Sequence, residues 1–233
     1  ENCRQTSTHV SFKIIDRFSE DIDIHIEPPA SLNVKTGRNQ GKPAHVKSRK
    51  DFYDWLAITK IKIDGIGTVE RDTAFDSEKL FSGGIRLRYR SFTNPIDDLK
   101  DGILLEAGFD VVAPNTAKDI SSWMYDYAAD KVDIIDNRAK DITCYDPGYT
   151  FVEKLQTIST KYRQQQKDRQ FPPNFMRHYY DVYSLLDRPE VQAFIGTEEY
   201  IAHKDRRFRS LDNKNIAKNE AFVLNDAETR RTY

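Results

Sequence analysis

The sequence contains no long hydrophobic run, and this absence argues against a membrane-spanning helix. No apolar stretch approaches the roughly 20 residues that a transmembrane helix needs. Residues 1–5 also lack the apolar segment that would mark a secretion signal. These two absences predict a cytoplasmic protein without a membrane partner.

Cysteine is scarce as well, since Cys3 and Cys144 are the only two cysteines in the 233 residues. Their spacing fits neither a metal-binding clip nor a disulfide framework. Apolar residues make up 38% of the chain and charged residues 31%, a composition that favours a folded, polar protein over a disordered one. The length suits one large domain or two small ones.

The net charge is only −1, but the charges are unevenly distributed along the chain. Residues 95–141 contain eleven acidic and five basic residues, whereas residues 154–218 contain thirteen basic and eight acidic ones. One interpretation is a metal-bearing face beside a face that binds a polyanion. The other is that the two halves simply attract each other, and the sequence alone leaves both open.

The clearest local signal is the alternation of polar and apolar residues over positions 21–26, which predicts a half-buried strand. One face would carry Ile22, Ile24 and Ile26, and the other would carry Asp21, Asp23 and His25. Carboxylates two residues apart lie about 7 Å apart along a strand and can converge on a hard cation. Magnesium prefers such oxygen ligands, so Asp21 and Asp23 predict a metal platform for nucleotide chemistry. The alternative is a solvated polar face.

The remaining patterns predict an α/β (α+β) protein. Apolar residues at helical spacing predict a helix that is capped by Ser48 and continues to Ile63, and a mostly helical region over residues 120–139. Alternation predicts strands over residues 85–90, 102–112 and 141–145. Two helical stripes follow, one formed by Phe151, Leu155, Ile158 and Tyr162 and the other by Phe175, Tyr179, Val182 and Leu186. We therefore expect an α/β domain with a mixed sheet over residues 1–146 and a helical region over residues 147–233.

Four segments, in order along the chain, are similar to the sequence blocks of one known family. They cover residues 17–23, which read R-F-S-E-D-I-D, and residues 105–110, 149–155 and 177–183. In these blocks the chain resembles the AbiEii/AbiGii-type toxins, nucleotidyltransferases related to the DNA polymerase beta superfamily. The likeness extends from about Thr6 to the region of residues 219–222.

The resemblance implies a nucleotidyltransferase-like mixed sheet followed by a helical subdomain. It implies a metal-dependent toxin of a toxin–antitoxin or phage-defence (abortive infection) system. Such a toxin would use Mg²⁺ and transfer a nucleotide from a nucleoside triphosphate to an RNA, with tRNA as a known acceptor of relatives, or to a protein. The implied partners are the nucleotide, the acceptor and a cognate antitoxin.

The resemblance also assigns catalytic roles to Asp21, Asp23, Glu106, Lys154 and Asp181. The aspartates of the first strand would hold the metal, and Glu106 would be the third acidic residue. Lys154 would bind triphosphate oxygens, and Asp181 would orient Lys154 or the nucleotide.

Each of these later assignments has a plainer alternative. Glu106 alone would be an ordinary rim residue, and Asp110 is the substitute candidate for its role. Lys154 alone would be a helix-surface lysine. Asp181 lies four residues after Arg177 and can pair with it along a helix. Tyr179 and Tyr180 can stack on a base, although aromatic residues at helical spacing more often belong to a core.

The nucleotide-binding residues that the resemblance implies are Thr6, Ser7, Arg17 and Ser19. The family carries Gly-Gly-Thr-Ser near its start, where glycines let backbone N–H groups approach a triphosphate. Here Arg4 and Gln5 stand in place of the glycines. This departure favours an alternative function, a truncated non-catalytic relative that acts as an RNA- or protein-binding module. A phosphodiesterase that uses the same carboxylates is a third possibility.

Overall fold

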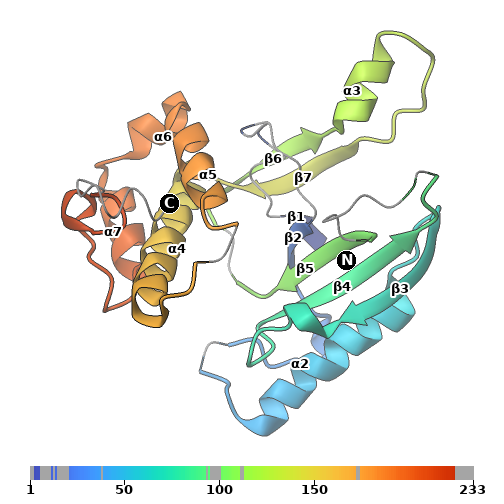
Figure 1. Cartoon of the computed structure of the whole chain (residues 1–233). Helices are drawn as coiled ribbons and strands as arrows, with labels where there is room; N and C mark the ends of the chain where they lie inside the picture. The colour runs from blue at the N-terminus through green and yellow to red at the C-terminus, as the bar shows by residue number, and fades with distance from the viewer. Residues whose placement is uncertain are drawn as a thin grey trace. The chain divides into compact units, whose positions relative to one another are not determined.

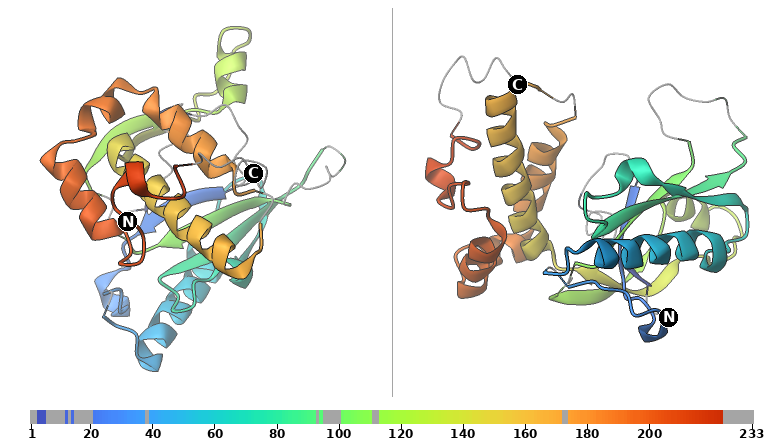
Figure 2. Two further views of the ribbon diagram at one scale, coloured as in Figure 1. Left: turned by 60° about the vertical axis from the view of Figure 1, so that its left-hand side comes forward. Right: turned by 90° about the horizontal axis from the view of Figure 1, so that it is seen from below.

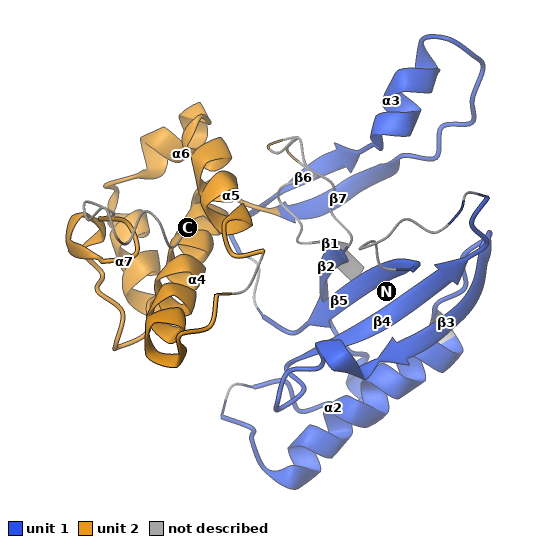
Figure 3. Cartoon of the chain, viewed as in Figure 1, with its two compact units in different colours: residues 1–7, 16–144 blue, residues 8–15, 145–233 orange. Residues whose placement is uncertain are grey.

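The computed structural model describes residues 3–5, 12, 14, 21–37, 39–92, 94, 101–110, 113–171 and 174–223. These residues form two compact units, which are coloured separately in Figure 3. The first unit extends to Cys144, and the second begins at Tyr145 and includes Ile14. Within the described ranges, none of the helices has both the length and the apolar character to cross a membrane.

The first unit is built mainly from strands (Figure 1). Its strands are β1 (Cys3–Gln5), β2 (Asp21–Ile26), β3 (Ile66–Asp72), β4 (Ser82–Tyr89), β5 (Ile103–Gly108), β6 (Asn115–Ile120) and β7 (Ala139–Tyr145). Its helical segments are η1 (Ala30–Leu32), α2 (Pro43–Trp55), the π-helical turn η2 (Leu56–Lys60), η3 (Thr73–Phe75) and α3 (Trp123–Ala129). The mixed α/β fold expected from the sequence is therefore confirmed.

Five of the described strands form one mixed sheet in the order β1-β2-β5-β4-β3. The β2–β5 pair is parallel, and the other neighbours are antiparallel. A parallel pair needs a long crossover connection, and the chain between β2 and β5 supplies it by forming α2 and the outer strands. The strands β6 and β7 pair separately as a two-stranded sheet.

The helix α2 covers one face of the larger sheet, as Figure 2 shows. Phe52 and Tyr53 are buried against Ile26 and Ala107, and the Tyr53 hydroxyl donates a 3.0 Å hydrogen bond to the Ala107 carbonyl. The alternating isoleucines of β2 face this core because successive strand residues point to opposite sides. The opposite side of β2 is thereby left for its polar residues.

The start of α2 differs from the sequence prediction, because the helix begins at Pro43 rather than after Ser48. Proline fits the first helical position, where its fixed φ suits the helix and its missing N–H is not needed. The Ser48 hydroxyl instead accepts a hydrogen bond from the Lys35 backbone N–H and donates one to the His45 carbonyl. The helical path ends at Lys60 in a π-helical turn, before Ile63.

The expected helical region over residues 120–139 was also wrong in extent. The helix α3 has only seven residues, and the Ser122 side chain caps it by accepting from the Tyr125 N–H. Residues 132–136 contain β-branched side chains and two aspartates, which are weaker helix formers than alanine or leucine. The chain instead forms a β6–α3–β7 unit in which the two strands pair, and β7 contains the predicted strand at residues 141–145 (Figure 1).

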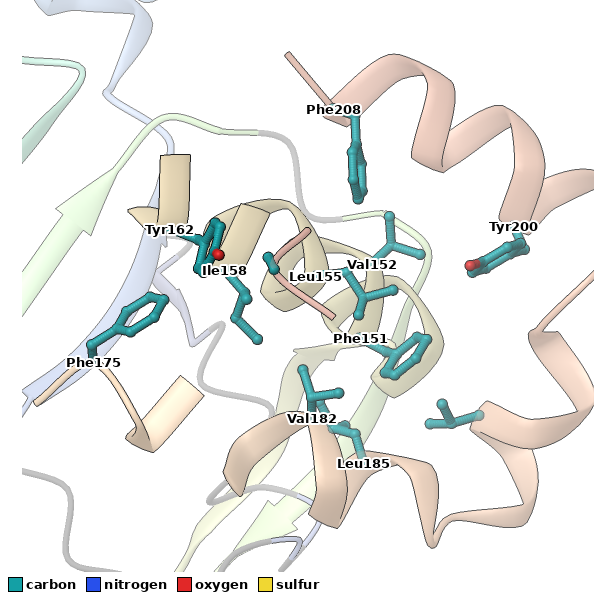
Figure 4. Close-up of a cluster of buried hydrophobic side chains, with 12 residues drawn as sticks. Phe151, Val152, Leu155, Ile158, Tyr162, Phe175, Val182, Leu185, Tyr200 and Phe208 are labelled. Carbon is teal, nitrogen blue, oxygen red and sulfur yellow. The ribbon is translucent and has the colours of Figure 1, made fainter. Parts of the chain in front are cut away.

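The second unit is helical, as the sequence predicted for the C-terminal half. Its elements are α4 (Pro147–Asp168), α5 (Arg177–Leu186), α6 (Pro189–Phe194), α7 (Glu198–Arg207) and η4 (Ile216–Lys218). The long helix α4 supplies the centre of its core: Figure 4 shows Phe151, Val152, Leu155 and Ile158 among residues from the later helices. The apolar stripe of α4 recognised in the sequence is confirmed as a core face.

On α5, however, the buried stripe differs by one residue from the predicted one. Leu185 is fully buried, whereas Leu186 is 38% exposed. Phe175 joins the core from the turn before the helix. Within α5, which starts at Arg177, the buried residues are His178, Asp181, Val182 and Leu185. They lie on one face of the helix, as the 3.6-residue periodicity requires.

A polar network around the buried His203 attaches α7 to α4. Arg206 donates to Nδ1 of His203 at 2.7 Å, so Nε2 carries the ring proton and donates to the Glu153 carboxylate at 3.1 Å. Arg207 forms an ion pair with the other Glu153 oxygen at 2.5 Å. Because Glu153 precedes Lys154, this network fixes the segment of α4 that carries Lys154.

We expect Gly84→Ala to lower the free energy of unfolding by about 1–3 kcal/mol, since overpacking forces backbone shifts. A Cβ atom at Gly84 in β4 would lie 2.9 Å from the Phe75 Cβ and would also clash with the Asp72 carbonyl. The matched control is Gly67→Ala in β3, where the nearest atom would be 3.6 Å away. Urea denaturation of both variants tests this, and equal midpoints would contradict it.

Candidate active site

The register between β2 and β5 brings the sequence-predicted acidic residues of the sheet onto one face. Asp23 lies directly opposite Glu106, and Asp21 lies opposite Leu104. Residues opposite each other on adjacent strands point to the same side, and the strand backbones lie about 4.8 Å apart. Asp21, Asp23 and Glu106 therefore share the face that is turned away from α2.

Burial differs among these three carboxylates. Asp23 is exposed, while Asp21 and Glu106 are partly buried. Neighbouring Leu104 on the same face is fully buried, so the carboxylates lie at the border of a dry region. Asp110, the substitute candidate, is exposed and follows the end of β5.

The donor chemistry of this face suits Mg²⁺, which takes hard oxygen ligands. In the described part of the chain, no group of three or more His, Cys, Asp or Glu side chains is arranged as a metal cluster. Magnesium commonly uses only one or two carboxylates together with substrate phosphates and water. The β2 aspartates and Glu106 therefore fit a substrate-assisted site better than an all-protein cage.

The same face carries an arginine that sequence reasoning did not select. Arg86 on β4 lies opposite Leu104, is only 5% exposed, and donates to one Asp72 oxygen at 3.0 and 2.6 Å. Its guanidinium carbon lies 5.6 Å from the centre of the Phe75 ring. The alternation of residues 85–90 predicted the strand that carries Arg86. It could not predict that this strand pairs with β5.

In the second unit, the structure brings Lys154 and Asp181 together. The Lys154 ammonium donates to the Asp181 carboxylate at 3.0 Å, and the Asp181 side chain is fully buried. The lysine side chain is 23% exposed. The pair joins α4 to α5, and the role of Asp181 in orienting Lys154 stays a prediction.

The remaining candidates fall into two groups. The Tyr179 hydroxyl donates to the Ala221 carbonyl at 2.7 Å, so this tyrosine secures the C-terminal segment, whereas Tyr180 is 40% exposed. Thr6, Ser7, Arg17 and Ser19 lie outside the described residues. The roles assigned to all these side chains, and to the sheet carboxylates and Lys154, stay predictions.

Comparison with known proteins identifies the family of the chain. A family model described as "Nucleotidyl transferase AbiEii toxin, Type IV TA system" matches residues 6–232. Among solved structures, the chain is similar to MenT4, a nucleotidyltransferase toxin from Mycobacterium tuberculosis H37Rv, with 11% sequence identity and a TM-score of 0.36. That alignment covers 93% of this chain and 72% of MenT4. No curated protein sequence matches the chain.

We expect Lys154→Met to destabilise the protein, because it leaves the buried Asp181 carboxylate without its lysine partner. The double variant Lys154→Met/Asp181→Asn should recover part of the loss. A double-mutant cycle from urea denaturation should give a coupling energy of about 0.5–3 kcal/mol. Strictly additive effects would show that the 3.0 Å contact contributes nothing to stability.

Proposed function

The chain belongs to the AbiEii nucleotidyltransferase toxin family, and we propose that it transfers a nucleotide from a nucleoside triphosphate to the hydroxyl of an RNA. The observation that carries the proposal is the one-for-one register that sets Asp23 opposite Glu106 with Asp21 on the same face. An acidic platform of this kind on adjacent strands suits phosphoryl chemistry, in which positioning and charge stabilisation do most of the catalysis.

In this reaction the acceptor oxygen forms a bond to the α-phosphorus, and the bond from that phosphorus to the pyrophosphate breaks. We assign Asp21 and Asp23 to the metal. Magnesium, when bound, supplies charge neutralisation at the phosphate oxygens and holds them in position. Glu106, opposite Asp23, is our candidate for accepting the proton that the acceptor hydroxyl loses.

Lys154 is assigned to the phosphates of the nucleotide. An ammonium is a compact charge with several donors, so it can bind phosphate oxygens while also donating to Asp181. The buried carboxylate fixes the position of the ammonium through the 3.0 Å contact and is therefore a positioning residue. Growing negative charge on the departing pyrophosphate would be stabilised by this fixed cation.

The charge distribution supports RNA as the acceptor. Residues 154–218 carry thirteen basic against eight acidic residues, and a net positive segment attracts the phosphate backbone of a nucleic acid. A toxin of this family implies a cognate antitoxin as a protein partner, and we include one in the proposal. The nucleotide and the acceptor RNA are left open.

One observation favours a second function, a non-catalytic RNA- or protein-binding module. Arg4 and Gln5 stand where the resembled family carries two glycines, and the sequence lacks the glycines that would let backbone N–H groups approach a triphosphate. Calorimetric titration with nucleoside triphosphates and magnesium separates the two functions. Binding favours the transferase, whereas its absence alongside RNA binding favours the module.

We expect Asp21→Asn and Asp23→Asn each to reduce nucleotidyl transfer by at least about 100-fold, because metal-assisted charge stabilisation is worth several kcal/mol. The assay follows labelled nucleoside triphosphates with tRNA and magnesium, and EDTA should abolish the product. Longer RNA indicates transfer, whereas shorter RNA would indicate a phosphodiesterase.

The matched control is Asp51→Asn on α2, an exposed aspartate that pairs along its own helix with Lys47 at 2.6 Å. Its activity should equal that of the unaltered protein. Full activity of the two β2 variants, with EDTA still inhibiting, would remove these aspartates from the mechanism.

A further inference from the structure

The second unit contains a cavity that the assigned catalytic residues do not use. It has a volume of about 390 Å³ and lies between the C-terminal half of α4 and the start of α5. Ligand sites in proteins typically occupy about 300–1,000 Å³, so the cavity can hold a small polar group. The cavity is open to solvent, since most of its lining residues are exposed. They are mainly of polar types: Lys161, Gln164, Gln165, Asp168, Gln170, Asn174, Phe175, Arg177 and His178.

Positive charge in this cavity is not neutralised by ion pairs within the described residues. Among the described residues, no carboxylate oxygen lies within 4.0 Å of the Lys161 ammonium or the Arg177 guanidinium. Nearby Lys154, in contrast, is paired with Asp181. Asp168 is the carboxylate in the lining, at the end of α4. Lys161 is exposed as a residue, but partial desolvation of its ammonium, followed by the neighbouring Arg177 and Lys154 cations, lowers its pKa. An anion in the cavity would relieve this repulsion.

The Lys161 side chain is held in place by a buried histidine. Its ammonium lies 2.9 Å from Nε2 of His178, which is only 7% exposed. The pKa of His178 is lowered to about 3, mainly because the ring is buried and also because Lys161 and other cations are near. The ring is therefore neutral at pH 7. A lysine ammonium can only donate, so Nε2 accepts and two ammonium hydrogens remain for a ligand.

We propose that Lys161 and Arg177 form a phosphate-binding subsite in this cavity, with His178 as the residue that positions Lys161. A phosphate oxygen accepts charge-assisted hydrogen bonds from both an ammonium and a guanidinium. The amide side chains of the lining supply further donors for the same group.

The subsite rests on the proposed function for the identity of its ligand. Lys161 lies seven residues, or about 10 Å, beyond Lys154 along the same helix. A phosphate in the cavity therefore belongs either to the far end of a nucleoside triphosphate or to the backbone of an RNA acceptor. The chemistry recognised is the same, and the experiment separates the two sources.

The test measures equilibrium binding by the full chain rather than turnover. The two probes are a short fluorescein-labelled single-stranded RNA, followed by anisotropy, and the nucleoside triphosphates ATP, GTP, CTP and UTP with magnesium, followed by calorimetry. Lys161→Met and Arg177→Gln each should weaken binding of at least one probe by at least about tenfold. The matched control is Lys167→Met, an exposed lysine in the last turn of α4 outside the cavity lining.

A salt titration and two His178 variants separate a ligand contact from a structural role. If RNA is the ligand, the slope of log K against log salt should fall by about 0.7 for each lost phosphate contact. His178→Leu should weaken binding, whereas His178→Gln, which keeps a buried acceptor, should restore part of it. Lys161→Arg, which keeps the charge, should also retain binding.

Weaker RNA binding alone identifies a backbone phosphate, and weaker nucleotide binding alone identifies the triphosphate. The subsite is overturned if both variants bind both probes as the unaltered chain does, if Lys167→Met loses as much, or if the unaltered chain binds neither probe. If transfer product never appears but Lys161→Met still weakens binding, the transferase proposal fails while the subsite stands.

Discussion

The parallel pairing of β2 with β5 is the constraint on which the acidic face of the sheet depends. Asp23 and Glu106 are far apart in the sequence, and only this pairing makes them neighbours. A shift of one residue would turn Glu106 toward α2 and Ala107 away from it. The burial of Ala107 and the hydrogen bond from Tyr53 to its carbonyl oppose such a shift. The core beneath the sheet thus fixes the acidic face above it.

In the helical unit, the lysine side chain of Lys154 lies beside the fully buried carboxylate of Asp181. Burying Asp181 completely is costly unless the charge is compensated, and the contact with Lys154 supplies that compensation. Lys154 in turn projects from α4, whose apolar face fills the core and whose Glu153 is held by His203 and Arg207. Its position is therefore defined by packing on one side and by ion pairing on the other.

Local patterns predicted the strand that carries Asp23 and the long helix that carries Lys154, because alternation and helical periodicity report burial directly. They could not predict that Asp23 lies opposite Glu106, since strand pairing is a long-range property. The start of α2 at Pro43 was missed because Ser48 offered an equally good cap and is instead used in a contact with a loop. The contact between Lys161 and His178 could not be predicted either, because the two residues belong to different helices and helix packing is a long-range property.

The helix α4 lies at the centre of a hydrophobic core and also carries Lys154. Cavity-forming changes at Leu155 or Ile158 would let the helix settle differently without touching any charged group. Genetic selections for inactive variants of this chain would therefore recover apolar positions of α4 alongside the charged ones. Inactive variants from such a screen should be tested for solubility and folding before any of them is taken as evidence for the proposed site.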